Sequence, residues 1–217
     1  MDAARTLGSG ERQAGLSGQP AHRRPTGHVL AQGHRVDAVE RVQDTASSHG
    51  SAFLVEVMGR RSGFLAASAA EACSVAGVVI PEQAWTLADL KEALHPGAVV
   101  LVSEGAWQEE VGSPESEKHL SGLVERLLGL LADEVGLSLR GTVLGHVLRG
   151  GSPCAADRLL ASSFACTAVD TISTGTSALV VQRNGRTSTV DITAASSGRR
   201  YLSVDDIESL NTPVVGR

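Results

Sequence analysis

Two segments far apart in the chain carry residue types that could bind an anion. Residues 55–60 read Val-Glu-Val-Met-Gly-Arg, and residues 142–153 read Thr-Val-Leu-Gly-His-Val-Leu-Arg-Gly-Gly-Ser-Pro. Each is an apolar strand pattern that ends in glycine and a cationic or imidazole side chain. Because ligands of open α/β sheets bind at the carboxyl ends of the strands, we expect Arg60, His146 and Arg149 to project into one cleft suited to a phosphate.

Each of these residues, taken alone, also has a simpler explanation. Arg60 and Arg61 could be two solvated cations at the end of a strand, and a single histidine such as His146 is more often a loop or core residue than a ligand. Glu104, an acid at the end of another apolar run, is of a kind common on protein surfaces. Residues 150–153 alone indicate only a turn followed by a helix. The phosphate interpretation therefore depends on all of them occurring together.

The composition limits the class of protein. The 217 residues suffice for one large domain, or for one and a half small ones. The apolar fraction of 42% is ordinary for a chain with a buried core. A formal net charge of -5 and an aromatic content of 3% argue against nucleic acid as a partner, because they support neither a basic face nor base stacking.

The cysteines and the apolar runs indicate the compartment. Cys73, Cys154 and Cys166 are odd in number and lack C-x-x-C spacing, which suits a reducing cytosol better than a disulfide framework or a zinc site. No apolar run reaches the length of a membrane span, and the N-terminal segment lacks the apolar core of a secretory signal. We therefore expect a cytoplasmic protein without a membrane partner.

Strand and helix patterns alternate from Val36 onward, which is typical of a doubly wound parallel sheet. The preceding residues, 1–34, are rich in Gly, Arg, Gln, His and Ser and are expected to be disordered. Residues after 191 are polar and are expected to be loosely held. The predicted elements are, in chain order, a helix over 36–46, a strand over 52–57, a helix over 63–73, a strand over 77–80, a helix over 86–95, a strand over 98–103, a helix over 114–135, a strand over 139–144, a helix over 153–172 and a hairpin of strands 178–182 and 187–191.

Several longer stretches of the sequence resemble the phosphofructokinase family, over about three quarters of the chain. They include Asp-Thr-Ala-Ser-Ser-His and Ile-Pro-Glu, and they lie at 44–49, 53–60, 62–65, 80–82 and 142–162. The resemblance implies an α/β fold of the Rossmann-like, phosphofructokinase-like type, incomplete in this chain. It also implies a 6-phosphofructokinase activity, in which ATP or pyrophosphate donates a phosphoryl group to fructose 6-phosphate, giving fructose 1,6-bisphosphate in glycolysis.

The resemblance further implies roles for residues at two strand ends. Met58, Gly59 and Arg60 are similar to the turn that contacts the sugar phosphate, and Arg60 is similar to the catalytic residue that stabilises the transferring phosphoryl group. A planar, permanently charged guanidinium suits that role, because the charge of the group is spread over three oxygens. Glu104 resembles the carboxylate that accepts hydrogen bonds from the sugar hydroxyls.

Three other residues are similar to substrate-binding residues of the family. His146 and Arg149 resemble donors to the 6-phosphate, and the glycines at 150–151 would let the backbone approach it closely. Arg140 resembles an arginine that reaches across a subunit interface into the neighbour's site. The resemblance therefore implies a homo-oligomer or a partner subunit.

The largest departure from the family lies before Val36. Members carry an N-terminal half with a Gly-rich phosphate-binding loop, a magnesium-holding Gly-Asp-Gly segment and an Asp-rich segment that supplies the base, and none of these motifs is found there. The expected organisation is a disordered segment 1–34, a fructose 6-phosphate-binding α/β domain 35–150, and a helix, hairpin and tail 151–217 that would pack on the missing donor domain. Magnesium is implied by the family alone, with its ligands in that absent half, and the choice between ATP and pyrophosphate stays open.

Smaller departures concern regulation and packing. Ser51 stands where the family often has an arginine that contacts the 6-phosphate, and 73–74, Cys-Ser, replaces a Gly-Gly pair that lines the effector pocket of bacterial members. Ser51 predicts weaker binding of the sugar phosphate, and the replaced Gly-Gly pair predicts no regulation of that type by a nucleoside diphosphate or phosphoenolpyruvate. The helix that follows residue 152 would lose its packing partners without the donor half, at the apolar side chains of Leu159, Leu160, Phe164 and Val169.

Three interpretations of function remain open on these residues. The first is a 6-phosphofructokinase, of which this chain carries the sugar-phosphate site. The second is a catalytically inactive homologue or fragment that binds a sugar phosphate, as a regulator or partner of an intact enzyme. The third is a decayed remnant without function. Binding of the sugar phosphate without turnover would favour the second.

Overall fold

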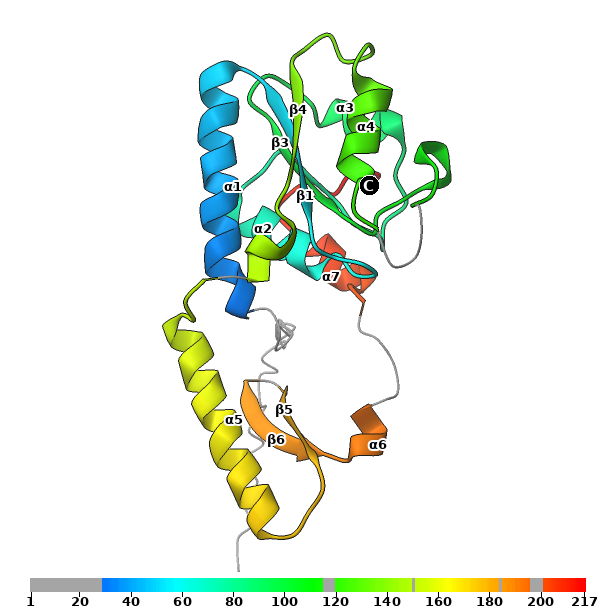
Figure 1. Cartoon of the computed structure of the whole chain (residues 1–217). Coiled ribbons are helices and arrows are strands. Elements are labelled where there is room, and N and C mark those ends of the chain that lie inside the picture. Colours follow the sequence, from blue (N-terminus) through cyan, green and yellow to red (C-terminus); the bar gives the residue numbers. More distant parts are fainter. Residues whose placement is uncertain (1–28, 115–119, 150, 184, 196–200) are drawn as a thin grey trace, which may run out of the picture.

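The computed structural model describes residues 29–114, 120–149, 151–183, 185–195 and 201–217 (Figure 1). In chain order the elements are α1 (Val29–His49), β1 (Ala52–Val57), α2 (Phe64–Cys73), β2 (Gly77–Val79), α3 (Leu87–Glu92), β3 (Val99–Ser103), the 3₁₀ helix η1 (Glu109–Val111), α4 (Leu123–Leu131), β4 (Leu139–Val143), the 3₁₀ helix η2 (Gly145–Arg149), α5 (Ala155–Ser173), β5 (Leu179–Arg183), β6 (Arg186–Val190), α6 (Ile192–Ala195) and α7 (Val204–Glu208).

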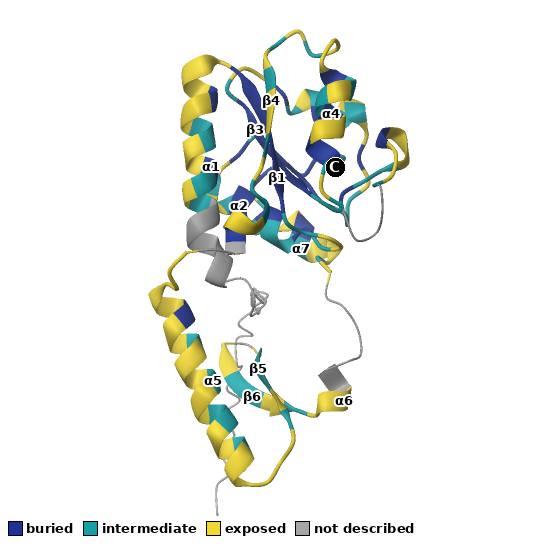
Figure 2. Ribbon diagram, in the orientation of Figure 1, coloured by how far each residue is buried: buried dark blue, intermediate teal, exposed yellow. Residues whose placement is uncertain are grey.

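The first four strands form one parallel sheet in the order β2-β3-β1-β4. Side chains alternate across it: Phe53 and Val55 of β1 pack in a core with α1 and α2, while Leu54 packs in a second core with α3 and α4. Both faces are therefore covered by helices, which is why β1, β2 and β3 are buried on both sides and their sequences are mostly apolar, while the edge strand β4 is partly exposed (Figure 2). The prediction of a doubly wound parallel sheet is confirmed.

The order of the strands fixes where a ligand crevice can form. The helix that follows β1, α2, lies on one face of the sheet, and the helix that follows β3, α4, lies on the other. Since β1 and β3 are neighbours, the chain leaves their carboxyl ends in opposite directions. Such a switch point is the place where doubly wound sheets bind their ligands.

The helix predicted over 114–135 is shorter than its apolar period suggests. The structure gives α4 nine residues, Leu123–Leu131, and residues 115–119 lie outside the described part of the chain. Gly122, at a φ of 111°, cannot continue a helix backward. Leu123, Leu127 and Leu131 recur at helical spacing and are fully buried. The helical periodicity therefore identifies the buried face of α4, and the backbone conformation of Gly122 determines where the helix starts.

Two other helix starts differ from their predictions. Helix α1 begins at Val29, so residues 29–34, which were expected to be disordered, form its first turns; residues 1–28 lie outside the described range. Helix α5 begins at Ala155 rather than at the expected proline, since the Asp157 carboxylate accepts a hydrogen bond of 2.7 Å from the Cys154 amide. A carboxylate three residues inside a helix stabilises its free amino end in this way.

The end of the chain packs on the sheet, and the prediction of a loosely held tail is wrong for residues 201–217. Val78 of the edge strand β2 donates to the Pro213 carbonyl oxygen and accepts from the Val215 amide, both at 3.0 Å. Ile207, which lies on α7, and Val214 are buried in the core. This pairing covers the exposed edge of β2. The division of the chain at residues 35 and 150 stays a prediction.

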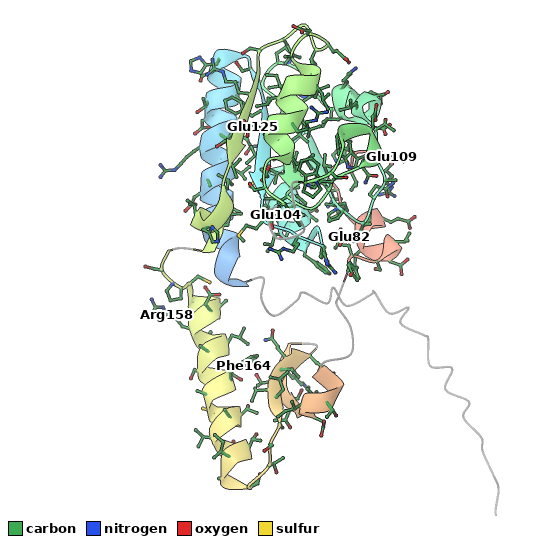
Figure 3. All side chains as sticks on the ribbon, turned by 45° about the vertical axis from the view of Figure 1, so that its right-hand side comes forward. Glu82, Glu104, Glu109, Glu125, Arg158 and Phe164 are labelled. Carbon is green, nitrogen blue, oxygen red and sulfur yellow. The ribbon has the colours of Figure 1, made fainter. Side chains whose placement is uncertain are left out.

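Helix α5 and the antiparallel hairpin β5–β6 are far more exposed than the sheet (Figure 2). Leu159 and Val169 are 72% and 65% exposed, so the expectation that they lack partners is confirmed within the described residues. Leu160 and Phe164 are half-buried, and Phe164 lies on the side of α5 that faces the hairpin (Figure 3). That a donor domain covers the exposed side stays a prediction.

Replacing Ser74 with glycine is expected to stabilise the chain by about 0.5–1 kcal/mol. Ser74 follows α2 and has a φ of 50°, the only positive φ of a non-glycine residue within the described ranges. A Cβ is unfavourable in that left-handed conformation, where glycine usually ends a helix. Thermal unfolding should show a midpoint higher by about 1–4 °C. A lower midpoint would mean that the serine side chain contributes more than its backbone strain costs.

Candidate functional site

The predicted anion-binding residues follow the carboxyl ends of three neighbouring strands. Residues 58–60 leave β1, Glu104 leaves β3, and η2 leaves β4. The last residue of β1, Val57, is level with Ser103, the last residue of β3, and Leu144 donates a backbone hydrogen bond of 3.0 Å to Glu56 just beyond β4. All three strands therefore end at one edge of the sheet, which is its lower end in Figure 1.

The turn after β1 and the carboxylate after β3 are in direct contact. The Gly59 amide donates to Glu104 Oε1 at 3.3 Å, and the Glu104 amide donates to the Val57 carbonyl oxygen at 2.9 Å. Glu104 is half-buried, and Arg60 is exposed at the same edge. The second oxygen of Glu104 keeps its capacity to accept hydrogen bonds, for example from hydroxyl groups. A guanidinium and a carboxylate acceptor thus lie on two adjoining loops.

Gly105 makes this contact possible, and sequence reasoning missed it. A Cβ added at Gly105 would lie 1.9 Å from the carbonyl oxygen of Arg60 and 2.8 Å from that of Gly59. Only a residue without a side chain lets the two loops approach this closely. The signal available in the sequence was a glycine directly after an apolar strand, where close backbone approach is common.

The far end of the same turn is held by a second carboxylate that sequence reasoning did not single out. Both oxygens of Glu82 accept from the Gly63 amide, at 3.0 and 2.8 Å, directly before α2. Oε1 also accepts from the Leu202 amide at 3.0 Å. The Ile-Pro-Glu stretch at 80–82 entered the sequence analysis only as part of a resemblance.

His146 and Arg149 belong to η2, at the carboxyl edge of β4. His146 is exposed, and Leu148 is buried against the core that includes α1 and α2. Gly145 has a φ of 47°, which turns the chain sharply at the end of the strand. The backbone of Arg149 ends η2. The structure therefore brings these two residues to the same edge as Arg60, on the neighbouring strand.

Arg140 is not brought to this edge. It lies in β4 opposite Phe53, six residues before Gly59, which corresponds to about 20 Å along the sheet. Its side chain is exposed on an edge strand. An arginine in that place can contact a second molecule more readily than the site of its own chain.

The described residues form no metal centre, and the thiol of Cys73 is not activated. No group of three or more His, Cys, Asp or Glu within them could hold a metal ion. Burial, and secondarily the charge of Glu40, raise the pKa of the Cys73 thiol above its ordinary value, so the thiolate is scarcer than in a free cysteine. None of the helices in the described ranges is long and apolar enough to cross a membrane.

Comparisons with known proteins identify the family and the fold of this chain. A sequence model of the family described as "Phosphofructokinase" matches residues 27–172. An ATP-dependent 6-phosphofructokinase of Wolinella succinogenes is 39% identical over 78% of this chain and 51% of its own length. A crystal structure of a Pichia pastoris phosphofructokinase superimposes with a TM-score of 0.63 at 29% identity, over 76% of this chain and 18% of that one.

A second solved structure extends the comparison of the fold. A pyrophosphate-dependent phosphofructokinase from Nitrosospira multiformis has a TM-score of 0.65 at 17% identity, over 83% of this chain and 50% of that one. The chain spans about half the length of the curated relatives it matches. The match of the family model over most of the chain, on a sheet whose carboxyl edge carries the expected residues, leads to one conclusion: this chain belongs to the phosphofructokinase family.

Proposed function

We propose that this chain carries the fructose 6-phosphate site of a 6-phosphofructokinase, which transfers a phosphoryl group from ATP or pyrophosphate to give fructose 1,6-bisphosphate. The observation that carries the proposal is the contact between the Arg60-bearing turn and Glu104, made by the Gly59 amide at the switch point of a family fold. It joins a permanent cation to a carboxylate acceptor, the two groups that a phosphorylated sugar needs.

Each end of the sugar phosphate has its own set of proposed partners. His146 and Arg149 bind the 6-phosphate at the end of β4, and the main chain of Met58 and Gly59 orients the sugar. The free acceptor capacity of Glu104 takes sugar hydroxyls. Arg60, in the same turn, contacts the bound sugar phosphate. It also stabilises the charge on the transferring phosphoryl group, since its fork matches oxygens that share that charge.

The remaining parts of the proposal rest on the family. Arg140, about 20 Å from Gly59 along the sheet, serves the site of a neighbouring subunit, so the working form is an oligomer. A cytoplasmic place suits a glycolytic activity. In the family, magnesium binds together with the phosphoryl donor. The described residues offer no set of ligands that fits a magnesium ion, so no step is assigned to a metal.

The test of the proposed function is calorimetric titration of the full chain with fructose 6-phosphate. Arg60→Ala should weaken binding about 10- to 100-fold, because a charge-assisted hydrogen bond is lost. Arg41→Ala, which removes an equal charge from the exposed surface of α1, should change it less than twofold. No binding by the unaltered chain, or equal effects of the two variants, would refute the proposal.

Turnover separates the enzyme from an inactive binding protein. The same chain is assayed with fructose 6-phosphate and magnesium in the presence of either ATP or pyrophosphate. Formation of fructose 1,6-bisphosphate with one donor identifies that donor. Binding of the sugar phosphate without any product would favour a sugar-phosphate-binding or regulatory protein.

A further inference from the structure

The turn that carries Arg60 is hydrogen-bonded at both ends to carboxylates, one from the chain after β3 and one from the chain after β2. At its start, the Gly59 amide donates to Glu104, directly after β3, at 3.3 Å. At its end, the Gly63 amide donates to both oxygens of Glu82, just beyond β2, at 3.0 and 2.8 Å. Figure 3 shows both labelled glutamates at the same end of the α/β layers. Hydrogen bonds to an ionised carboxylate are the stronger kind.

The end held by Glu82 is also sterically confined. A Cβ on Gly63 would lie 2.4 Å from Ile80 Cγ2 and 3.0 Å from Glu82 Oε2. The backbone therefore rests directly on the chain that follows β2. Because α2 begins at Phe64, the carboxylate also lies at the positive end of the dipole of a ten-residue helix. The position of the turn and the start of the helix thus depend on one side chain.

We propose that Glu82 is a positioning residue of the sugar-phosphate site, acting through Gly63 on the turn that presents Arg60. The inference rests on the proposed function and adds to it a residue that does not touch the substrate. Without the carboxylate, the Gly63 amide loses its acceptor, and the tie of Gly59 to Glu104 at the other end of the turn stays. Arg60 then samples positions away from the bound sugar phosphate, and binding weakens although every ligand-contacting residue is present.

Glu71 supplies a matched control. Glu82 also accepts from Leu202 at 3.0 Å and so helps to hold the C-terminal segment 201–217. Glu71, on α2, holds the same segment, since its carboxylate accepts from the Asn211 amide at 2.9 Å and from the Asn211 side chain. Glu71 does not bond the turn in these contacts. Replacing either glutamate loosens the C-terminal segment, and only Glu82 adds a loss at the turn.

The experiment compares the full chain with Glu82→Ala, Glu82→Gln and Glu71→Ala. We expect Glu82→Ala to weaken fructose 6-phosphate binding about tenfold in calorimetry. Glu82→Gln, which keeps one acceptor oxygen, should recover part of the affinity. Glu71→Ala should lower the unfolding midpoint to a similar extent and leave affinity within twofold. Unchanged binding by Glu82→Ala, or equal weakening by Glu71→Ala, would overturn the proposal; if Glu82→Ala does not fold, Glu82→Gln alone against Glu71→Ala decides.

Hydrogen exchange gives a readout that does not need a substrate. Amides of residues 59–65 should exchange faster in both Glu82 variants than in the unaltered chain, and Glu71→Ala should leave them unchanged. Unchanged exchange at the turn in the Glu82 variants would overturn the positioning role. A chain whose turn responds in this way, but which binds no fructose 6-phosphate, would refute the proposed function and leave Glu82 as the residue that fixes the turn.

Discussion

Replacing Gly105 with alanine is expected to weaken fructose 6-phosphate binding at least about 100-fold. The added Cβ would lie 1.9 Å from the carbonyl oxygen of Arg60 and 2.5 Å from its carbonyl carbon, distances that no non-bonded atoms tolerate. The obstacle is backbone rather than a flexible side chain, so the turn itself must move. A displacement of about 1 Å at such a site is enough for this loss. Calorimetric titration of the purified variant measures it.

The control for this prediction is Gly129→Ala. Gly129 lies on the exposed side of α4, and a Cβ there meets nothing within 4 Å. Alanine should stabilise that helix by about 1 kcal/mol and leave binding unchanged. The Gly105 variant should also unfold at a lower temperature, because overpacking typically costs about 1–3 kcal/mol. Full affinity in Gly105→Ala would show that the two loops can separate without cost to the site.

The sequence was sufficient for the layers of the fold and for the edge on which the site lies. Apolar runs such as 52–57 and 98–103 are buried on both faces, so their composition identifies them as parallel strands without knowledge of their neighbours. The helix predicted from residue 86 does start there, because Thr86 and Asp89 form a capping box, which is a local signal. Local and periodic signals were therefore predicted well.

Features that depend on contacts between distant residues were not predicted. The start of α4 is set by Gly122 and by Glu56, 66 residues earlier in the chain. The tie between Glu82 and Leu202 joins residues 120 apart. Nothing in the period or composition near either partner reports such a pair, because each glutamate is an ordinary acid in its own segment. The close approach of Gly105 to the backbone of Arg60 also depends on a distant contact that the sequence near Gly105 does not report.

In the candidate site, too, residues were predicted and the contacts that hold them were not. Arg60 was named from its residue type at a strand end and Glu104 from the family resemblance, and these two loops do meet. What holds them in place was not visible, since Gly105 acts through its missing side chain and Glu82 acts through a backbone amide. A resemblance transfers side chains that touch a ligand more readily than the backbone contacts that hold those side chains in position.

Glu56→Ala is expected to lower the free energy of unfolding by about 3–5 kcal/mol. The Glu56 carboxylate, on β1 and 1% exposed, accepts from Ser121 Oγ at 2.6 Å, from the Gly122 amide at 3.2 and 3.1 Å, and from the Val124 amide at 3.1 Å. Alanine would leave several donors unsatisfied at the start of α4 and a cavity between helix and sheet. Urea unfolding, with the midpoint and slope both fitted, measures the loss.

The charge of Glu56 matters less in this prediction than its burial, and Glu125 separates the two. Glu125 lies in the first turn of the same helix and is exposed, so it can favour the helix dipole but satisfies no buried donor (Figure 3). Glu125→Ala should therefore cost about 1 kcal/mol or less. If both variants lost the same small amount, the contact of Glu56 with α4 would contribute only through its charge. A large loss confined to Glu56 means that one buried carboxylate holds β1 and α4 together. Because β1 carries the Arg60 turn, the edge of the sheet with the candidate site and the helix layer that contains α4 then unfold as one unit.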